Sequence, residues 1–260
     1  MNLKQLRRTV MPRGFGVKAR RRWRDRLLRR LGLERSYKPL ALVTEPHLVG
    51  GSLLPMVMAD FLLRYNNLTF MQIGAFDGVK NDDLFEFICR HRLRGVLVEP
   101  QPRAFAALAR NYRDQPQLKL LNVAISADVG SRPLYIPRRG TSTVASFDRG
   151  HLLRHGLAGE DIVAHTVNCM PVAAALQAAG FDQVDLLQID AEGYDYEILR
   201  TIDFSQLRPA IVRYEYRHLS QDDADRAVHL LAAHGYRFFV EQRDIVAYRP
   251  RAVLAGGAAA

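Results

Sequence analysis

This sequence of 260 residues contains very little cysteine. Its two cysteines, Cys89 and Cys169, lie far apart, and neither belongs to a C-x-x-C pair or to a Cys/His spacing that ligates zinc. The sequence therefore argues against a disulfide framework and against a structural zinc site. Because no disulfide requires an oxidising compartment, we expect the protein in the reducing cytoplasm.

Long apolar runs are also absent. No uninterrupted run reaches the roughly 18 residues that span a bilayer. Arg7 and Arg8 precede a mixed, charged segment rather than the apolar core of an export signal. We therefore expect a cytoplasmic protein with no transmembrane segment.

Basic residues are abundant but concentrated in one part of the chain. The formal net charge is +10, a value that would indicate nucleic-acid binding if the charge were spread evenly. Residues 1–38 alone hold 14 Lys and Arg against Asp25 and Glu34, a net charge of +12, whereas the remaining residues carry 23 basic and 25 acidic side chains. We therefore divide the chain into a basic arm at 1–50, a catalytic domain at 51–250 and a disordered tail at 251–260.

The arm contains a short pattern of helical periodicity. Four apolar side chains recur at helical spacing among its arginines, namely Trp23, Leu27, Leu28 and Leu31. An amphipathic helix of this kind suits an anionic membrane surface. Two other interpretations remain open, in which the apolar stripe packs on the catalytic domain or the arm is a solvated tail. Peripheral contact with the inner membrane face is thus one hypothesis for this segment.

From Leu53 onward, short apolar runs alternate with amphipathic stretches, which is typical of a doubly wound sheet. The strands are predicted at residues 68–73, 95–98, 118–123, 186–189, 210–214, 236–240 and 245–248. The helices are predicted at residues 53–65, 82–91, 103–112, 172–179, 194–201 and 221–234. Because the last two strands are too close for a helical crossover, they form an antiparallel hairpin. The sequence thus predicts an α/β fold with a mostly parallel, seven-stranded sheet.

Between Ser131 and Val167 this alternation lapses, and only a short strand flanked by Pro133 and Pro137 is predicted. Residues 138–150 are rich in Gly, Ser, Thr and Arg, and a loop of this length in a compact domain is usually functional or disordered. We expect this loop to cover the acceptor, with Arg138, Arg139 and Arg149 available for an anionic or glycosidic group.

The first predicted strand runs into a glycine turn of the kind that binds nucleotide cofactors. The turn spans Gly74 to Gly78, and Asn81 follows as the expected N-cap of the next helix. Glycines allow a sharp turn and a close approach of the ligand. Glu99 ends the second strand 25 positions after Gly74, where a carboxylate accepts hydrogen bonds from ribose hydroxyls.

The charge of this turn indicates which nucleotide fits. A dinucleotide site needs the G-x-G-x-x-G spacing to bind a pyrophosphate, but this turn has only two glycines and is flanked by Asp77, Asp82 and Asp83. These carboxylates would repel phosphate, and no Walker-type lysine motif is present. They suit a ligand with an ammonium group, a sulfonium and an adenosine, which describes S-adenosylmethionine.

A second group of polar residues follows two later strands. The apolar run 186–189 ends at Asp190 and Glu192, while Glu215 and His218 follow the run 210–214. Because carboxyl ends of parallel strands face the ligand crevice, these four are candidate catalytic residues. Asp195 and the nearby Glu197 are expected on the surface of the following helix, and taken alone His218 would read as an ordinary loop histidine.

Five blocks of the sequence, in this order, resemble the FkbM family of S-adenosylmethionine-dependent methyltransferases. They are residues 72–82, residues 98–102 with Leu108 and Asn111, residues 122–126, residues 189–195, and Arg208-Pro209 with Glu215. The resemblance covers residues 68–218 and implies a class I, Rossmann-like methyltransferase fold. It also implies O-methylation of a hydroxyl, often on a sugar, a glycan or another natural product.

The same resemblance implies roles for the residues that would bind the cofactor. Gly74, Ala75 and Asp77 would line its methionine end, Glu99 would bind the ribose, and Ala124 would contact the adenine. The full set of expected cofactor-binding residues is Gln72, Gly74, Ala75, Asp77, Asn81, Glu99, Pro100 and Ala124. The sequence departs from the family pattern at Gln72, where many members carry an acidic residue, and at Gln188, where many carry a lysine.

The chemistry expected of this site is an in-line transfer of a methyl group to an oxygen whose proton must be accepted. Asp190, Glu192, Glu215 and His218 are the candidates for that step, and the sequence does not single out one of them. The same set would also suit a divalent ion, although the spacing defines no ligand sphere and we assign no metal ligands.

Two other classes of function remain as alternatives. A nucleic-acid methyltransferase would account for the basic arm, but the Asn/Asp-Pro-Pro-aromatic motif of enzymes that methylate base amino groups is absent and the catalytic domain is slightly acidic. A non-catalytic scaffold would keep the fold without the chemistry. Binding of the cofactor distinguishes that scaffold from an enzyme.

Overall fold

The computed structural model describes residues 53–139, 143–241 and 243–249. The predicted basic arm with its amphipathic helix and the predicted C-terminal tail lie outside these residues. Both cysteines lie inside them, and both are free thiols. No helix in the described part of the chain combines the length and the apolar character needed to cross a membrane.

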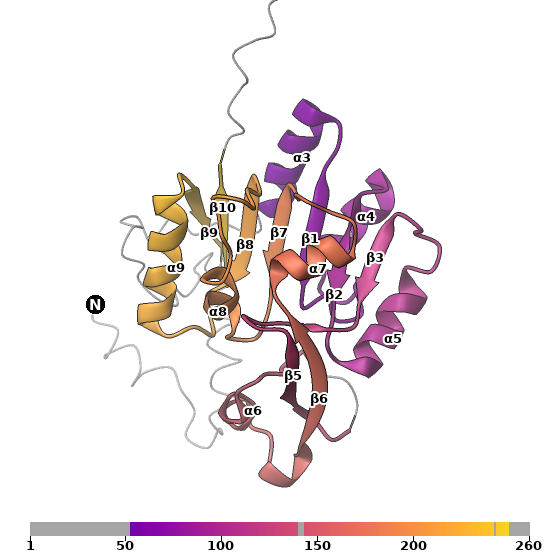
Figure 1. The fold of residues 1–260 in the computed structure, drawn as a ribbon, viewed down its shortest axis with the longest axis vertical. Coiled ribbons are helices and arrows are strands. Elements are labelled where there is room, and N and C mark those ends of the chain that lie inside the picture. Colours follow the sequence, from indigo (N-terminus) through magenta and orange to yellow (C-terminus); the bar gives the residue numbers. More distant parts are fainter. Residues whose placement is uncertain (1–52, 140–142, 242, 250–260) are drawn as a thin grey trace, which may run out of the picture. The chain divides into compact units, whose positions relative to one another are not determined.

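The central element is a seven-stranded sheet with the order β3-β2-β1-β7-β8-β10-β9 (Figure 1). Every adjacent pair is parallel except the two pairs formed by β10, which runs antiparallel to both neighbours. The strands are β1 (Thr69–Ile73), β2 (Arg94–Val98), β3 (Leu118–Leu121), β7 (Leu186–Ile189), β8 (Ile211–Glu215), β9 (Arg237–Val240) and β10 (Asp244–Tyr248). The predicted α/β fold, with its mostly parallel sheet and C-terminal hairpin, is confirmed.

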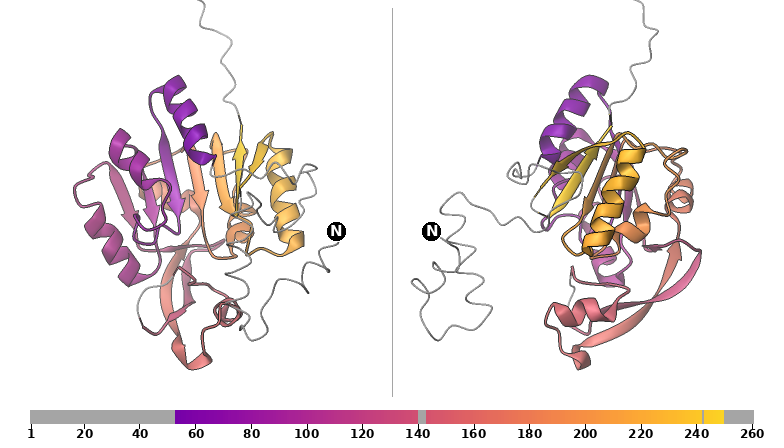
Figure 2. Two further views of the ribbon diagram at one scale, coloured as in Figure 1. Left: turned by 180° about the vertical axis from the view of Figure 1, so that it is seen from behind. Right: turned by 90° about the vertical axis from the view of Figure 1, so that its left-hand side faces the viewer.

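Helices cover both faces of this sheet. One apolar cluster joins it to α3 (Leu54–Tyr65), α4 (Phe85–His91) and α5 (Pro102–Asn111). A second cluster joins the other face to α7 (Val172–Ala178), α8 (Asp195–Leu199) and α9 (Gln221–Ala233). Figure 2 shows α3 and α9 on opposite sides of the sheet. Side chains alternate along β1, so that Phe70 packs in the first cluster and Met71 in the second.

Local signals in the sequence mark several helix ends. Ser220 caps α9 by accepting a hydrogen bond from the Asp223 N–H at 3.1 Å. Pro102 is the first residue of α5, where its missing N–H has no cost. Asn66 ends α3 with a φ of 51°, in the left-handed region that Asn tolerates.

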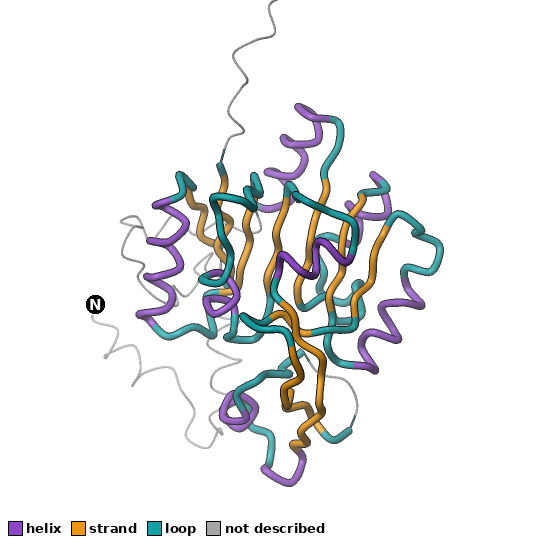
Figure 3. Tube along the Cα trace, viewed as in Figure 1, coloured by secondary structure: helices purple, strands orange, loops and turns teal. Residues whose placement is uncertain are grey.

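A second, smaller sheet occupies the segment between Ser131 and Val167, where the sequence predicted only a short strand flanked by Pro133 and Pro137. It contains β4 (Ala124–Ile125), β5 (Gly130–Pro137) and β6 (Ile162–Met170) in the order β4-β6-β5, and Figure 3 shows its two long strands side by side. α6 (Arg149–Arg154) and the short 3-10 helix η2 (Gly159–Asp161) lie between β5 and β6 in the chain. The prediction of a strand at 118–123 was also wrong at its end, because the chain leaves the main sheet after Leu121 and enters the second sheet at Ala124.

The strand register brings the predicted site residues to one edge of the main sheet. Ile73 of β1 is paired with Ile189 of β7, which is paired in turn with Tyr214 of β8. The residues that follow these three positions are Gly74, Asp190 and Glu215, so they lie on neighbouring strands at the carboxyl edge. This is the edge at which parallel α/β sheets bind ligands.

Candidate active site

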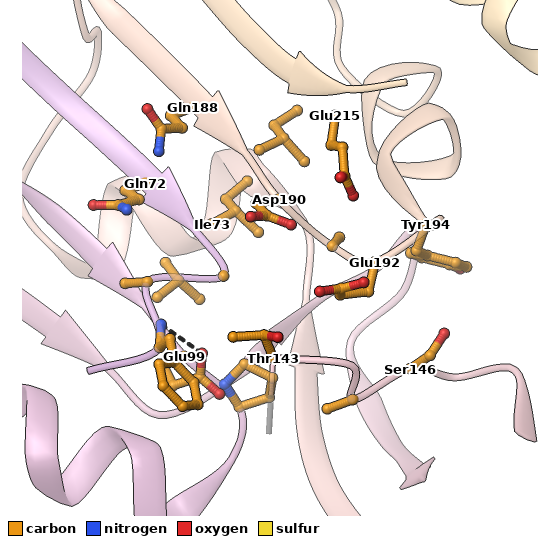
Figure 4. Close-up of a pocket in the computed structure, with 18 of the residues that line it drawn as sticks. Gln72, Ile73, Glu99, Thr143, Ser146, Gln188, Asp190, Glu192, Tyr194 and Glu215 are labelled. Atoms are coloured by element: carbon orange, nitrogen blue, oxygen red, sulfur yellow. Dashed lines mark hydrogen bonds between the residues drawn. The ribbon is translucent and has the colours of Figure 1, made fainter. Parts of the chain in front are cut away.

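A cavity of about 460 Å³ lies between this edge and the second sheet, a size within the usual range for small-molecule sites. Figure 4 shows Glu99 on one side of it and Glu192, Tyr194 and Ser146 on the other, with Asp190 between them. All the predicted site residues except one line this cavity: Gln72, Gly74, Ala75, Asn81, Glu99, Pro100, Ala124, Asp190, Glu192, Glu215 and His218. The exception is Asp77.

The turn after β1 depends on its first glycine. Gly74 has a φ of 82°, and a Cβ at this position would lie 1.9 Å from the carbonyl oxygen of Asp190. A side chain is therefore excluded both by the backbone conformation and by the neighbouring chain. Asp77 does not line the cavity. It stabilises the turn, since its Oδ1 accepts hydrogen bonds from the N–H groups of Val79 and Lys80.

Glu99 both holds this turn and presents a carboxylate to the cavity. Its side chain is buried, and its two oxygens accept hydrogen bonds from the N–H groups of Phe76 at 2.9 Å and Gln101 at 2.8 Å. Burial raises the pKa of Glu99 to about 7, although these two N–H groups act in the opposite direction. The Gln101 side chain also hydrogen-bonds this carboxylate, and because a carboxylate offers about four acceptor positions, one remains that a hydroxyl of a ligand can use.

An apolar wall lies next to Glu99. Val123, Ala124 and Ile125 line this part of the cavity together with Pro100. Asn122 fixes the wall against the end of β2, because its side-chain amide donates hydrogen bonds to the carbonyl oxygens of Glu99 at 2.8 Å and Pro100 at 3.2 Å. The wall has the chemistry needed to contact a flat, largely apolar ring.

Gln72 and Gln188 lie beside each other on β1 and β7. The Gln72 amide donates a hydrogen bond to Asp82 at 3.0 Å, and burial raises the pKa of that carboxyl. Gln188 accepts a hydrogen bond from Arg213 at 3.4 Å. The other atom of the Gln72 amide, Oε1, is buried without a hydrogen-bond partner and is available to a donor on a ligand.

Arg213 on β8 is the centre of a buried ion cluster that sequence reasoning missed. Its Nη2 lies 2.7 Å from Asp83, 2.9 Å from Asp244 and 3.3 Å from Glu241. Burial raises the pKa of Asp244 to about 6 even though Arg213 opposes the shift. The other oxygen of Glu241 accepts hydrogen bonds from the N–H groups of Leu53 and Leu54 at the start of α3, so this cluster connects α3 to the sheet.

Asp190 and Glu215 place two carboxylates near each other at the ends of β7 and β8. Asp190 is open to the cavity, yet protein atoms surround it closely. Within the described residues, no donor hydrogen-bonds its carboxylate. The burial of each carboxyl group and its repulsion by other carboxylates raise the pKa of Asp190 and of Glu215 well above their ordinary values.

Asp195 corrects one sequence-based expectation. It was expected on the surface of the helix after β7, but it is fully buried, and its carboxylate accepts hydrogen bonds from the N–H groups of Glu215, Ala191 and Gly193. Asp195 therefore joins the loop after β7 to the end of β8. Glu197 does lie on the surface, where it forms an ion pair with Arg200.

Three histidines lie together at the far side of the site from Glu99. His218 follows β8, while His151 and His155 come from α6 and its C-cap. The ring centroids are 4.5 to 5.1 Å apart. Burial, reinforced by the other two rings, lowers the pKa of His218 to about 3. Sequence reasoning missed His151 and His155, although the His-x-x-x-His spacing was a signal that could have found them.

Aromatic residues form another wall of the cavity. Phe147 and Tyr194 meet edge to face with centroids 5.2 Å apart, and the Arg132 guanidinium lies over Phe147 and donates to the Tyr194 hydroxyl at 2.9 Å.

The three arginines expected to bind the acceptor from the loop at 138–150, namely Arg138, Arg139 and Arg149, do not line the cavity. Arg138 and Arg149 donate to the carbonyl oxygens of Glu160 and Gly159.

The lining as a whole suits the cofactor expected from the sequence. It contains the buried carboxylate of Glu99, an apolar wall, and a glycine turn that leaves no room for a side chain. Seven carboxylates and four basic side chains line the cavity. A ligand that carries an ammonium and a sulfonium stabilises the ionised form of these carboxyl groups, whereas a ligand that carries phosphates does not.

Comparisons with known proteins agree with this chemistry. The sequence model of the methyltransferase FkbM domain family matches residues 72–238 of this chain. No curated protein matches the sequence. Together with the sheet described above, the family match confirms the class I, Rossmann-like fold that the sequence predicted.

Solved structures similar to this chain include three methyltransferase-type proteins. The FkbM methyltransferase from Methylobacillus flagellatus has a TM-score of 0.47 at 15% sequence identity. The match covers 84% of this chain and 49% of that protein, so this chain spans about half of its length. The O-methyltransferase from Bacillus cereus in complex with SAH has a TM-score of 0.38 at 9% identity, covering 95% of this chain and 96% of that one. Fibrillarin from Aeropyrum pernix, with bound S-adenosyl-L-methionine, has a TM-score of 0.36 at 14% identity over 70% and 66% of the two chains.

Proposed function

Because this chain belongs to the FkbM methyltransferase family, we propose that it transfers the methyl group of S-adenosylmethionine to a hydroxyl oxygen of a sugar, glycan or other natural-product acceptor. The observation that carries this proposal is the placement of two groups of residues in one cavity. The Gly74 turn and Glu99 lie on one side, and a set of proton-accepting side chains lies on the other.

The residues on the first side would hold the cofactor. Glu99 would accept hydrogen bonds from the ribose hydroxyls, Ala124 and Pro100 would contact the adenine, and the Gly74–Ala75 backbone would lie along the methionine end. Gln72 Oε1 offers a further acceptor for its ammonium group. When bound, S-adenosylmethionine supplies an electrophilic methyl group on a sulfonium.

The residues on the second side would orient the acceptor and take its proton. Among the proton-accepting groups that line the cavity, Asp190, Glu192, Glu215 and His218 are the four that we propose for this step. Phe147 and Tyr194 add aromatic faces against which the C–H face of a sugar ring packs. This wall favours a glycosidic acceptor over a small, flexible alcohol.

Methyl transfer can be tested without knowing the acceptor. Extracts of cells that lack the protein would be incubated with the purified full-length chain and methyl-labelled S-adenosylmethionine, and labelled products would be identified by mass spectrometry. We expect label in a methyl ether of a saccharide or related metabolite. Label in RNA or DNA would instead support the nucleic-acid alternative, and binding of the cofactor with no labelled product in any fraction would support the non-catalytic scaffold.

Glu99→Ala is expected to weaken S-adenosylmethionine binding by about 10- to 150-fold, since charge-assisted hydrogen bonds are each worth about 1.5–3 kcal/mol. Isothermal titration calorimetry of the two proteins measures this difference. Glu86→Ala is a matched control, because Glu86 is exposed on α4. Equal affinities of the Glu99→Ala and native proteins would remove Glu99 from the cofactor site.

The pH dependence of this binding has a defined sign. The pKa of Glu99 is about 7, and the charged carboxylate is the better acceptor for ribose hydroxyls. Affinity should therefore be highest above pH 7 and fall as the pH drops below it. Because other carboxylates also line the cavity, the informative quantity is the part of this dependence that disappears in Glu99→Ala.

We also propose that the basic arm attaches the enzyme to an anionic surface, as its charge of +12 within residues 1–38 suggests. Deletion of residues 1–38 should then leave cofactor binding unchanged and abolish co-sedimentation with acidic vesicles. Each Lys or Arg near such a surface contributes about 1 kcal/mol, and salt screens the attraction over roughly 8–10 Å, so binding should be strong only at low ionic strength.

Two other results of the deletion experiment would argue against membrane attachment. Binding of the full-length protein to RNA with a steep salt dependence, and not to vesicles, would favour a nucleic-acid partner. Early melting of the truncated protein would show instead that Trp23, Leu27, Leu28 and Leu31 pack on the catalytic domain.

A further inference from the structure

Five potential metal-ligating side chains from three separate segments meet at one side of the cavity. His151 and His155 come from the α6 region, Glu192 from the loop after β7, and Glu215 and His218 from the end of β8 and the residues after it. The ligand atoms of His151, His155 and His218 lie within 4.8 Å of one another, and so do those of Glu192, Glu215 and His218. His218 belongs to both groups and makes them one cluster.

The distances within this cluster are those of a coordination polyhedron. His151 Nε2 lies 3.3 Å from Glu192 Oε2, and His218 Nε2 lies 3.6 Å from Glu192 Oε2 and 3.5 Å from Glu215 Oε2. Ligand atoms at about 2.0–2.2 Å from a tetrahedral ion lie about 3.3–3.6 Å from each other. These three contacts, which link the four atoms in a chain from His151 through Glu192 and His218 to Glu215, therefore have the spacing expected of neighbouring ligands of one ion.

Two of these atoms have no hydrogen-bond partner. His151 Nε2 and Glu192 Oε2 are both buried and unsatisfied, and the His151 residue is only 4% exposed. The two atoms lie 3.3 Å apart without forming a hydrogen bond to each other, and a buried polar atom without a partner is unfavourable. A cation that contacts both would satisfy them together.

The backbone is shaped to bring these side chains together. Glu192 has a φ of 49°, a left-handed conformation that is uncommon for residues other than Gly, Asn and Asp and that concentrates at functional sites. Gly193, with a φ of 94°, follows it, and a Cβ there would lie 3.5 Å from His218 Cβ and 3.7 Å from His151 Nδ1. These are ordinary van der Waals distances, so it is the backbone conformation that favours glycine at 193, and the loop passes directly against both histidines.

We propose that His151, His218, Glu192 and Glu215 bind one divalent transition-metal ion, with His155 as a further nitrogen donor within reach. Imidazole and carboxylate ligands together select Zn²⁺, Fe²⁺, Co²⁺ or Mn²⁺ over Mg²⁺ and Ca²⁺, which prefer all-oxygen sites. His218, Glu192 and Glu215 also line the cavity, so the ion faces the reacting groups. If the proposed function holds, the acceptor oxygen would enter as a fifth ligand, and the ion would lower the pKa of the hydroxyl that is methylated.

Cobalt is a suitable probe because its visible absorption reports both binding and ligand geometry. The full-length protein, stripped with EDTA and dialysed, would be titrated with Co²⁺ and separately with Zn²⁺ by calorimetry. We expect one ion per chain and weakening of at least about tenfold in Glu192→Gln and in His151→Ala. His165→Ala is the matched control, since His165 is exposed on β6.

Each outcome of this titration has a defined meaning. Co²⁺ binding that is absent, or that is unchanged by Glu192→Gln and His151→Ala, overturns the metal site. If His151→Ala does not fold, the nearly isosteric Glu192→Gln still tests the site, and Zn²⁺ should raise the melting temperature of the native protein more than that of Glu192→Gln. Binding of S-adenosylmethionine is measured separately. If the native protein binds Co²⁺ but not S-adenosylmethionine, the proposed function alone is contradicted. If it binds S-adenosylmethionine but not Co²⁺, the metal site alone is contradicted.

Discussion

Replacing Asp190 by Asn should leave the affinity for S-adenosylmethionine near that of the native protein and lower turnover by about 10²- to 10⁴-fold, the usual contribution of a general base. Asn has nearly the same shape as Asp but does not accept a proton. Asp190 lies at the carboxyl end of β7, opens into the cavity, and receives no hydrogen bond from the described residues. A carboxylate placed in this way is free to accept a proton from a bound hydroxyl.

The measurement is the steady-state rate of methyl transfer to an identified acceptor, together with calorimetry of cofactor binding. Asp128→Asn is the control, because Asp128 is exposed in the turn before β5. A large rise in KM with unchanged kcat would make Asp190 a binding residue rather than a base. Native turnover in Asp190→Asn would exclude it from the chemistry, leaving Glu192, Glu215 and His218 as the candidates.

The main sheet was predictable because its strands are buried on both faces and therefore form continuous apolar runs. β7 was predicted with the bounds that the structure gives it, and the other six strands differ mainly at their ends. The second sheet was not predictable in this way. β5 is exposed along its first half and contains Pro133 and Pro137, which are typical of loops and edge strands. Its partner β6 has three buried residues at irregular spacing, Ile162, Val167 and Cys169, so neither strand gives a clear periodic signal.

The same difference separates the site residues that the sequence predicted from those that it did not. Residues at the ends of the main strands could be predicted because one rule places the carboxyl ends of parallel strands at the ligand crevice. His151 and His155 enter from the unpredicted insertion between β5 and β6. The role of Arg213 could not be predicted, because its partners Asp83, Glu241 and Asp244 are distant in the sequence and meet it only in the folded chain. The burial of Asp195 was missed for the same reason.

Arg213→Met should lower the free energy of unfolding by about 3 kcal/mol at pH 8. Removing one partner of a buried ion pair typically costs about 3–5 kcal/mol, and we expect the lower end of this range because Asp83 is partly exposed. Arg213 is the common partner of three carboxylates, and the side chain of Glu241 is only 4% exposed. Met would fill much of the same space but leave these charges facing one another.

The loss of stability in Arg213→Met should increase as the pH rises. A carboxyl group whose pKa is raised in the folded state reduces stability above its unfolded pKa, and the loss grows as the pH rises through the shifted value. The pKa of Asp244 is about 6 with Arg213 present and must rise further without it. The variant should therefore lose least stability near pH 5, where the carboxyls of the cluster take up protons, and most at pH 8.

Urea unfolding followed by circular dichroism at the two pH values measures both quantities. Arg200→Met is the matched control, because Arg200 forms an exposed pair with Glu197 and such pairs contribute at most about 1 kcal/mol. A loss below that level in Arg213→Met at pH 8 would show that water in the cavity already solvates the three carboxylates. A loss that is equal at pH 5 and pH 8 would assign the effect to packing, because only repulsion between ionised groups is relieved by protonation.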